Sequence, residues 1–397
     1  MTGLTPLEVA SGLVLGLGPD RPLRRRARDA TPLGALEAAV RPALEQPPCL
    51  VSFSGGRDSS AVLAVAASVA RREGLLLPVP ATNRFPEVPT ADETDWQENV
   101  VKALRLDDWL RLEFRDELDC VGPVARAVLL RHGLLWPCNA HFHGPLLEAA
   151  GGGSLLTGIG GDEAFGTSRR RRAALVLSGK IRPVRRDALR VAFGLAPRTL
   201  RRRVVRRDAP RDEWLRPAAQ TEIVRAWTEL ASGEPLRWRA HVRSLSRLRY
   251  QEVGLASLDL LAADHDVRLV HPFVETRFLE ALAASPPAGA DRTNALRAVV
   301  GSLLPDDVLE RSTKSSFDGA FFSTHSRAFA ASWAGEGADT EIVDVDWLAE
   351  HWRSGRPVGR TFTQLQASWL AAKRREQEVE RISEPIPAAA SPQLPGG

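Results

Sequence analysis

A glycine-rich loop with one aspartate is the first segment whose residue types and spacing could do chemistry. It follows the short apolar run Cys49–Phe53 and consists of Ser54, Gly55, Gly56, Arg57, Asp58, Ser59 and Ser60. Glycines let a backbone approach a phosphate closely, and serine hydroxyls and the N–H groups of a following helix can donate hydrogen bonds to it. Asp58 would repel a bare phosphate but suits one that carries Mg²⁺. The lysine of the GxxxxGK(S/T) loop is absent, so the segment predicts a different kind of phosphate site.

A second glycine loop carries two adjacent carboxylates. It begins at Thr157 and Gly158, continues through Ile159 to the pair Asp162 and Glu163, and ends at Gly166. Two carboxylates on a glycine loop at the carboxyl end of a strand fit a metal and nucleotide site. The structural alternative is a glycine turn with an exposed acidic pair.

A third segment, 311–319, contains Lys314, which is one of only four lysines in the chain. A cation held in a site that excludes water could neutralise charge that builds up on a phosphate during reaction. A lysine without such a context is usually a solvated surface group. The segment follows Leu303-Leu304-Pro305 and a short stretch from Arg292 to Arg297.

The elements that must position these residues alternate between strand and helix. Strands are predicted at Cys49–Phe53, Leu75–Ala81, Trp109–Phe114 and Ser154–Thr157, with helices at Ser59–Glu73, Thr90–Leu104 and Leu118–Arg131. Thr90 and Glu93 have the spacing of a capping box at a helix start. Such alternation predicts an α/β fold with a parallel sheet and right-handed crossovers. Parallel strands place their carboxyl ends at one edge, so both glycine loops are expected there.

The remaining segments define the expected domain organisation. Residues 1–46 are predicted as a short helical segment and 47–380 as one domain, with a nucleotide-binding part (47–168), an arginine-rich part (169–207) and a helical part (212–380). Residues 381–397, rich in proline and alanine, are expected to be a disordered tail. Trp227, Trp238 and Trp333 are expected in the core. The arginine-rich part is either a solvated helical face or flexible excursion, or a patch for an acidic ligand or partner.

Composition excludes several classes of protein. The 397 residues include 53 basic and 49 acidic ones, and a net charge of +4 is too small to indicate a nucleic-acid partner. Cys49, Cys120 and Cys138 are odd in number and widely spaced, which argues against a disulfide scaffold or a CxxC site. No apolar run reaches about 18 residues and no signal peptide is recognisable, so no membrane partner is expected and a soluble cytoplasmic protein is predicted. No HExxH pattern supports zinc.

Taken in order, the three motifs resemble the synthetase domain of the asparagine synthetase family, a branch of the ATP pyrophosphatases. The first loop is similar to SGGxDS and the second to SGxGxDExFGG. Leu296, Arg297, Pro305, Lys314 and Phe317 match the KxxLR, LP and RxKxxF elements, although Thr293 stands where a lysine is usual. The stretch 265–275 is similar to HGxExRxPFLD, with His265 and His271 expected to be structural. The resemblance covers about residues 47–320 and implies an adenine nucleotide α-hydrolase-like, Rossmann-like fold.

The resemblance also implies a reaction and a set of roles. A carboxylate attacks the α-phosphate of Mg·ATP, and an amine then converts the acyl-adenylate into an amide and AMP. Asp58 and Asp162 would hold Mg²⁺–pyrophosphate, and Lys314 would be catalytic. Thr157 and Gly158 would line the adenosine side, Glu163 would lie at the nucleotide site, and Val51 and Thr82, at the sheet edge, would lie near adenine and ribose.

Two departures limit what the resemblance implies about substrates. The chain begins Met1-Thr2-Gly3, without the cysteine that opens the glutaminase domain of asparagine synthetase. The nitrogen is therefore expected from free ammonia, a substrate amine or a separate ammonia source. Ile159 stands where asparagine synthetases carry glutamate and β-lactam synthetase carries tyrosine, and isoleucine cannot transfer a proton.

Several readings of the function therefore stay open. The acid is a small molecule or a peptide, the latter as in the lasso-peptide cyclases, which join a side-chain carboxyl to a peptide's own amine. A tRNA-modifying ATP pyrophosphatase and a catalytically degenerate, nucleotide-binding scaffold are the alternative functions.

Overall fold

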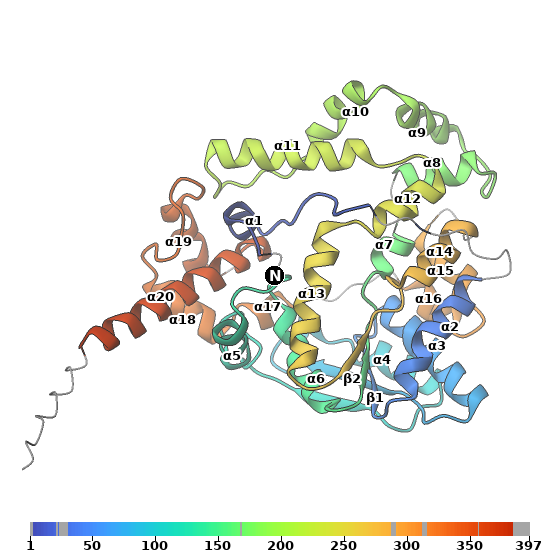
Figure 1. Ribbon diagram of the computed structural model, residues 1–397, viewed down its shortest axis with the longest axis horizontal. Helices are drawn as coiled ribbons and strands as arrows, with labels where there is room; N and C mark the ends of the chain where they lie inside the picture. Colours follow the sequence, from blue (N-terminus) through green and yellow to red (C-terminus); the bar gives the residue numbers. More distant parts are fainter. Residues whose placement is uncertain are drawn as a thin grey trace, which may run out of the picture.

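A five-stranded parallel sheet forms the centre of the computed structural model, which describes residues 3–20, 23, 31–166, 169–286, 291–311, 316–355 and 357–383. The strands are β1 (Cys49–Ser52), β2 (Val79–Arg84), β3 (Leu110–Glu113), β4 (Ser154–Leu156) and β5 (Arg268–Val270). Their order is β3-β2-β1-β4-β5, and all four neighbouring pairs are parallel. The predicted α/β fold with a parallel sheet is confirmed (Figure 1).

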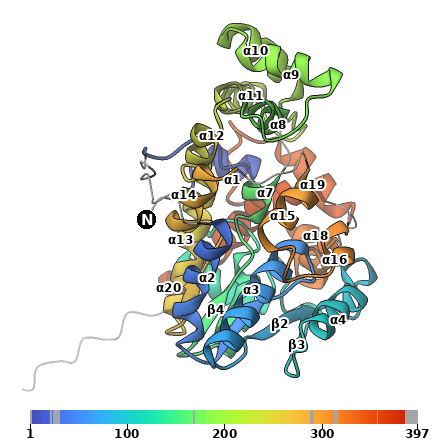
Figure 2. The ribbon, with the colours of Figure 1, turned by 90° about the vertical axis from the view of Figure 1, so that its right-hand side faces the viewer.

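Helices cover both faces of the sheet (Figure 2). One face packs against α2 (Pro32–Leu44), α3 (Arg57–Glu73) and α14 (Thr276–Ala284), and the other against α6 (Gly144–Ala149) and α13 (Arg249–Ala263). In β1, Val51 belongs to the first core and Leu50 to the second, as the alternation of side chains along a strand requires. Because both faces are covered, the two central strands β1 and β4 are mostly apolar. The docking of α2 joins part of the N-terminal segment to this core.

A second hydrophobic core lies among the C-terminal helices. It includes Trp214, Trp333, Trp352 and Trp369. The helices that surround it include α1 (Pro6–Ser11), α11 (Pro217–Gly233), α18 (Thr324–Ser332), α19 (Val345–Arg353) and α20 (Phe362–Ser383). The burial predicted for Trp333 is therefore confirmed, and Trp238 is also buried, on α12 (Trp238–Leu245) beside the first core. Trp227 is only partly buried, so its prediction as a core residue is wrong.

The arginine-rich part is helical. It forms α8 (Arg169–Leu177), α9 (Arg185–Leu195), α10 (Arg198–Val205) and the 3-10 turn η3 (Arg206–Asp208), which lie far from the sheet in both views. Two acidic residues offset part of its charge. Asp187 pairs with Arg172 and Arg190, and Glu229 pairs with Arg198 and Arg202.

Three predicted boundaries differ from those of the structure. The capping box at Thr90 does not form, since the Thr90 hydroxyl donates to Ser316 and the Glu93 carboxylate pairs with Arg311. Helix α4 therefore begins only at Thr94, and the predicted helix from residue 118 begins at Pro123 (α5, Pro123–His132). Strand β2 begins at Val79 because residues 75–78 form the connection from α3 back to the sheet.

The remaining elements are short or lie near the site. The helices are α4 (Thr94–Ala103), α7 (Gly161–Phe165), α15 (Arg292–Val300), α16 (Asp306–Glu310) and α17 (Asp318–Phe321). The 3-10 turns are η1 (Pro89–Ala91), η2 (Ala140–His143) and η4 (Gly359–Thr361). In the described ranges, no helix is both long and apolar enough to cross a membrane. Of the expected disordered tail, residues 384–397 lie outside the described ranges.

Candidate functional site

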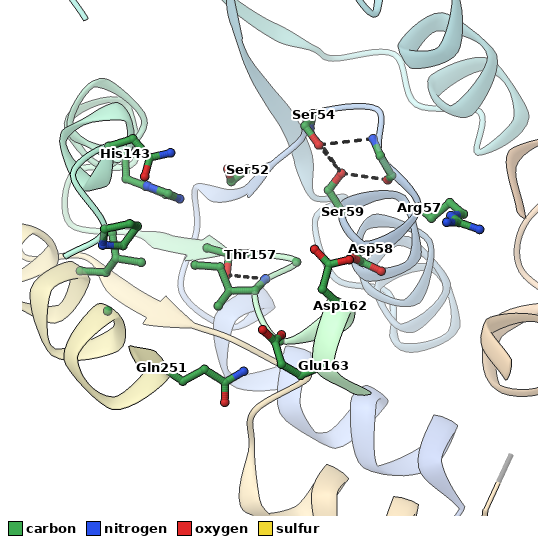
Figure 3. A pocket seen from close by; sticks show the side chains of 18 of the residues that line it. Ser52, Ser54, Arg57, Asp58, Ser59, His143, Thr157, Asp162, Glu163 and Gln251 are labelled. Carbon is green, nitrogen blue, oxygen red and sulfur yellow. Dashed lines mark hydrogen bonds between the residues drawn. The ribbon is translucent and has the colours of Figure 1, made fainter. Parts of the chain in front are cut away.

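A cavity of about 760 Å³ opens at the carboxyl edge of the sheet (Figure 3). Eight of the predicted site residues line it, from both glycine loops: Ser54, Gly56, Asp58, Ser59, Thr157, Gly158, Asp162 and Glu163. The loops are about a hundred residues apart in sequence, yet they meet because β1 and β4 are parallel neighbours. The cavity is thus where the strand pattern placed it.

The first loop has the shape of an anion-binding turn. Gly56 begins α3, and its N–H donates to the Ser54 hydroxyl, while the Ser59 hydroxyl donates to the Gly56 carbonyl. Gly55 has a φ of +77°, and a Cβ there would lie 2.8 Å from Cγ of Gln97, so only glycine fits. The N-terminal end of α3 consequently faces the cavity with its free N–H groups.

Two predicted residues shape this loop from behind. The hydroxyl of Ser60 is buried and donates to the Gly56 carbonyl at 2.8 Å. The Gly55 carbonyl accepts from Nη1 of Arg311 at 2.8 Å, and Arg311 also pairs with Glu93. Neither Ser60 nor Gly55 is part of the cavity wall.

The two aspartates lie side by side and share one guanidinium. Asp58 is in the first turn of α3 and Asp162 in the first turn of α7, and Arg292 of α15 pairs with both carboxylates. Figure 3 shows the two acidic side chains pointing into the same space. A Cβ at Gly161 would lie 2.3 Å from Cγ of Asp58, so the missing side chain at 161 lets the second loop approach the first.

The acidic pair could hold a divalent cation. Burial raises the pKa of Asp58, and the guanidinium of Arg292 offsets only part of that shift. Oδ1 of Asp58 is buried and has no hydrogen-bond partner among the residues that the structure describes. Among the described residues no group of three or more His, Cys, Asp or Glu side chains could hold a metal. A Mg²⁺ ion here would therefore take two carboxylates from the protein and its other oxygens from phosphate and water.

Glu163 lines the large cavity and pairs with a residue that the sequence analysis did not select. The hydroxyl of Tyr250, at the start of α13, donates to the Glu163 carboxylate. Burial, and then the negative charge of Glu163, raises the pKa of Tyr250, so the phenol stays protonated. Tyr250 is the only tyrosine of the chain, but nothing in the spacing connects it to residue 163.

A smaller cavity of about 190 Å³ adjoins the large one at the ends of β1 and β2. Both cavities are lined by Ser52, Asn139 and His143. The smaller one is also lined by Asn83, Phe85 and Phe142. Val51 is fully buried in the core, and the Thr82 hydroxyl donates to the Phe53 carbonyl and accepts from Trp109. Val51 and Thr82 line neither cavity, and their nucleotide role stays a prediction.

Lys314 lies outside the described residues, but residues on either side of it reach the site. Arg311 and Phe317 both line the large cavity. Arg297, which matched the family pattern, instead pairs with Asp306 and Glu310 away from the cavity. Arg292, at the start of the same helix, enters the site instead, and only its position beside a recognised motif could have indicated this.

His271 is buried behind the second loop, whereas the half-buried His143 lines both cavities. Nδ1 of His271 lies 2.6 Å from the Thr157 hydroxyl in a hydrogen bond. Burial lowers the pKa of His271 to about 3 and that of His143 to about 4. Both rings are therefore neutral at neutral pH, and His271 holds Thr157 in place as a structural residue.

This burial predicts an acid-sensitive fold. An unfolded histidine has a pKa of about 6.5, so below that pH the unfolded chain binds a proton that folded His271 excludes until about pH 3. The free energy of unfolding should lose roughly 1–2 kcal/mol from this residue between pH 7 and pH 5. Urea unfolding at the two pH values should show a smaller loss in His271→Asn than in the wild type, with His265→Asn as control. Equal losses in all three proteins would contradict the assignment.

The comparisons with known proteins agree with this geometry. The family model described as asparagine synthase matches residues 33–376, a region that begins in α2, ends in α20 and includes both glycine loops, α13 and α15. No curated protein matches the chain. Since the match spans most of the sequence and includes the whole cavity, the chain belongs to the asparagine synthase family. The activity of this family is that of an ATP-dependent ligase.

Proposed function

We propose that this protein is an AMP-forming carboxylate–amine ligase. A carboxylate oxygen attacks the α-phosphorus of ATP, the bond to the β-phosphate oxygen breaks, and pyrophosphate leaves with the bonding electrons. An amine then attacks the acyl carbon, AMP leaves, and the amine loses one proton as the amide forms. The observation that carries the proposal is the meeting of Asp58 and Asp162 beside the first glycine loop, where one buried carboxylate oxygen has no hydrogen-bond partner among the described residues.

The phosphate end of the cavity supports the first step. The free N–H groups of α3 and the hydroxyls of Ser54 and Ser59 would hold pyrophosphate. Mg²⁺ bound by Asp58 and Asp162 would neutralise charge on the phosphates. Arg292 balances the two carboxylates and would share or give up one of them to the ion. Lys314 is proposed to stabilise the charge that develops on the α-phosphate and on the leaving group.

The smaller cavity suits the adenosine. Phe85 and Phe142 provide aromatic surface there, and Oδ1 of Asn83 is a buried acceptor without a partner. An adenine amino group could donate to that oxygen. Thr157 and Gly158 lie on the large-cavity side, between this position and the acidic pair.

Glu163 is the proposed proton acceptor for the second step. It lines the large cavity beside Ile159, which has no group able to move a proton. The hydrogen bond from Tyr250 fixes the orientation of its carboxylate. Glu163 would thus supply what the isoleucine at 159 cannot.

Removal of the Lys314 side chain should strongly slow the first step. Lys314→Ala is expected to lower the rate of ATP–pyrophosphate exchange, measured with a panel of carboxylic acids, by roughly 100-fold or more. Lys180→Ala, which removes an exposed lysine after α8, should leave exchange unchanged. Full exchange activity in Lys314→Ala would refute the catalytic role.

A methyl group at residue 161 should block the cation site without unfolding the protein. Gly161→Ala forces the Asp58 carboxylate out of its position, and the affinity for Mg·ATP, measured by calorimetry, should fall roughly tenfold or more. Gly144→Ala is a matched control, because Gly144 also begins a short helix and a Cβ there meets only Val124, at 3.6 Å. Unchanged Mg·ATP affinity in Gly161→Ala would oppose the cation site, and no Mg·ATP binding by the wild type would favour a scaffold protein.

Replacement of the proton acceptor should separate the two steps. Glu163→Gln is expected to retain ATP–pyrophosphate exchange but to lower amide formation by roughly 10²–10⁴-fold. Hydroxylamine, which is unprotonated at neutral pH, should restore part of the product as hydroxamate. A parallel loss of exchange and amide formation would instead place Glu163 in the nucleotide site.

A further inference from the structure

In the described part of the large cavity, one wall carries no charged side chain and is mostly apolar, although the amides of Asn139 and Gln251 also line the cavity there. The apolar residues of this wall are Trp136, Pro137, Ile159, Gly254, Leu255 and Leu258. Figure 3 shows Gln251, from the same helix as the last three residues, across the cavity from Ser54 and Arg57. The apolar wall is thus separate from the phosphate loop.

This wall is a built surface. Tyr250, Gly254 and Leu258 follow each other at intervals of four residues and therefore lie on one face of α13. The Trp136 N–H donates to the Ser257 hydroxyl at 3.1 Å, which ties the tryptophan segment to that helix. A Cβ at Gly254 would lie 3.7 Å from Pro137 and 3.8 Å from Cδ1 of Trp136, so the glycine faces the ring across ordinary contact distance.

The charges of the cavity are all on other elements. Among the described lining residues, Arg292 pairs with both aspartates, Arg311 pairs with Glu93, and Arg57 donates to Thr293. The carboxylate of Glu163 accepts from Tyr250. In the part of the cavity wall that the structure describes, α13 and residues 136–139 contribute no lysine, arginine, aspartate or glutamate.

A dicarboxylic amino acid is a poor match for such a wall. Beyond the carboxylate that reacts, it carries an ammonium and a second carboxylate, and a buried charge needs a charged or hydrogen-bonding partner. A hydrocarbon chain or ring suits the apolar wall, because burying the hydrocarbon there removes apolar surface from water. With adenosine in the smaller cavity and pyrophosphate at the first loop, this wall is left for the acid.

We infer that the acid activated by this protein carries an apolar carbon chain or ring next to its carboxylate, and that Trp136, Ile159, Gly254 and Leu258 hold it. The inference rests on the proposed ligase function and names the substrate class for the same site. Each methylene that enters the apolar wall should tighten binding about fourfold until the space is filled.

The test uses non-hydrolysable acyl-adenylate mimics on the full chain. Acylsulfamoyl-adenosines with butanoyl, octanoyl, phenylacetyl and aspartyl groups are compared by calorimetry, and Mg·ATP binding is measured separately. The octanoyl or phenylacetyl mimic should bind at least tenfold more tightly than the aspartyl mimic. Equal or tighter binding of the aspartyl mimic overturns the inference, whereas absence of Mg·ATP binding would refute the ligase function itself.

A variant locates the acyl group. Leucine is a better helix former than glycine, so Gly254→Leu should fold while its side chain fills the space beside Trp136. The octanoyl mimic should then bind at least tenfold more weakly. Unchanged Mg·ATP binding would show that the rest of the site is intact. Ala256→Leu, at an exposed position of the same helix, is the matched control and should bind both ligands as the wild type does. Undiminished binding of the octanoyl mimic by Gly254→Leu would overturn the placement.

Discussion

The site depends on holding two carboxylates together at the edge of the sheet. Asp58 and Asp162 begin separate helices, and their mutual repulsion must be compensated. The guanidinium of Arg292 pairs with both, and the absence of a side chain at Gly161 gives Asp58 its space. Among the described residues, one buried oxygen of Asp58 has no hydrogen-bond partner, and the proposed Mg²⁺ would bind there.

The same edge of the sheet divides the cavity into unlike halves. The loops after β1 and β4 bring the charges and the helix N-termini, whereas α13 and the segment at Trp136 bring apolar surface. Where such a wall and a bound substrate exclude water, the interactions of the paired charges become stronger. The halves therefore support each other, although they come from distant parts of the chain.

The parts of the fold that the sequence predicted are those encoded by local pattern. The apolar run at Cys49–Ser52 and the glycine loop after it needed no distant partner to be recognised, and both glycine loops lie where the strand alternation placed them. The capping box predicted at Thr90 and Glu93 does not form, because both side chains instead contact residues more than two hundred positions away in the sequence. Local spacing carries no information about such partners.

The sequence by itself thus determined the α/β class, the two glycine loops with their acidic residues, and the family, since each follows from residue types at short spacing. Only the tertiary structure decided that Arg292 rather than Arg297 enters the site, that Tyr250 holds Glu163, and that Val51 and Thr82 lie behind the cavity wall. The physical reason is that side-chain pairing and burial depend on how helices pack across the sheet. Packing at that scale joins residues whose sequence separation leaves no periodic signal.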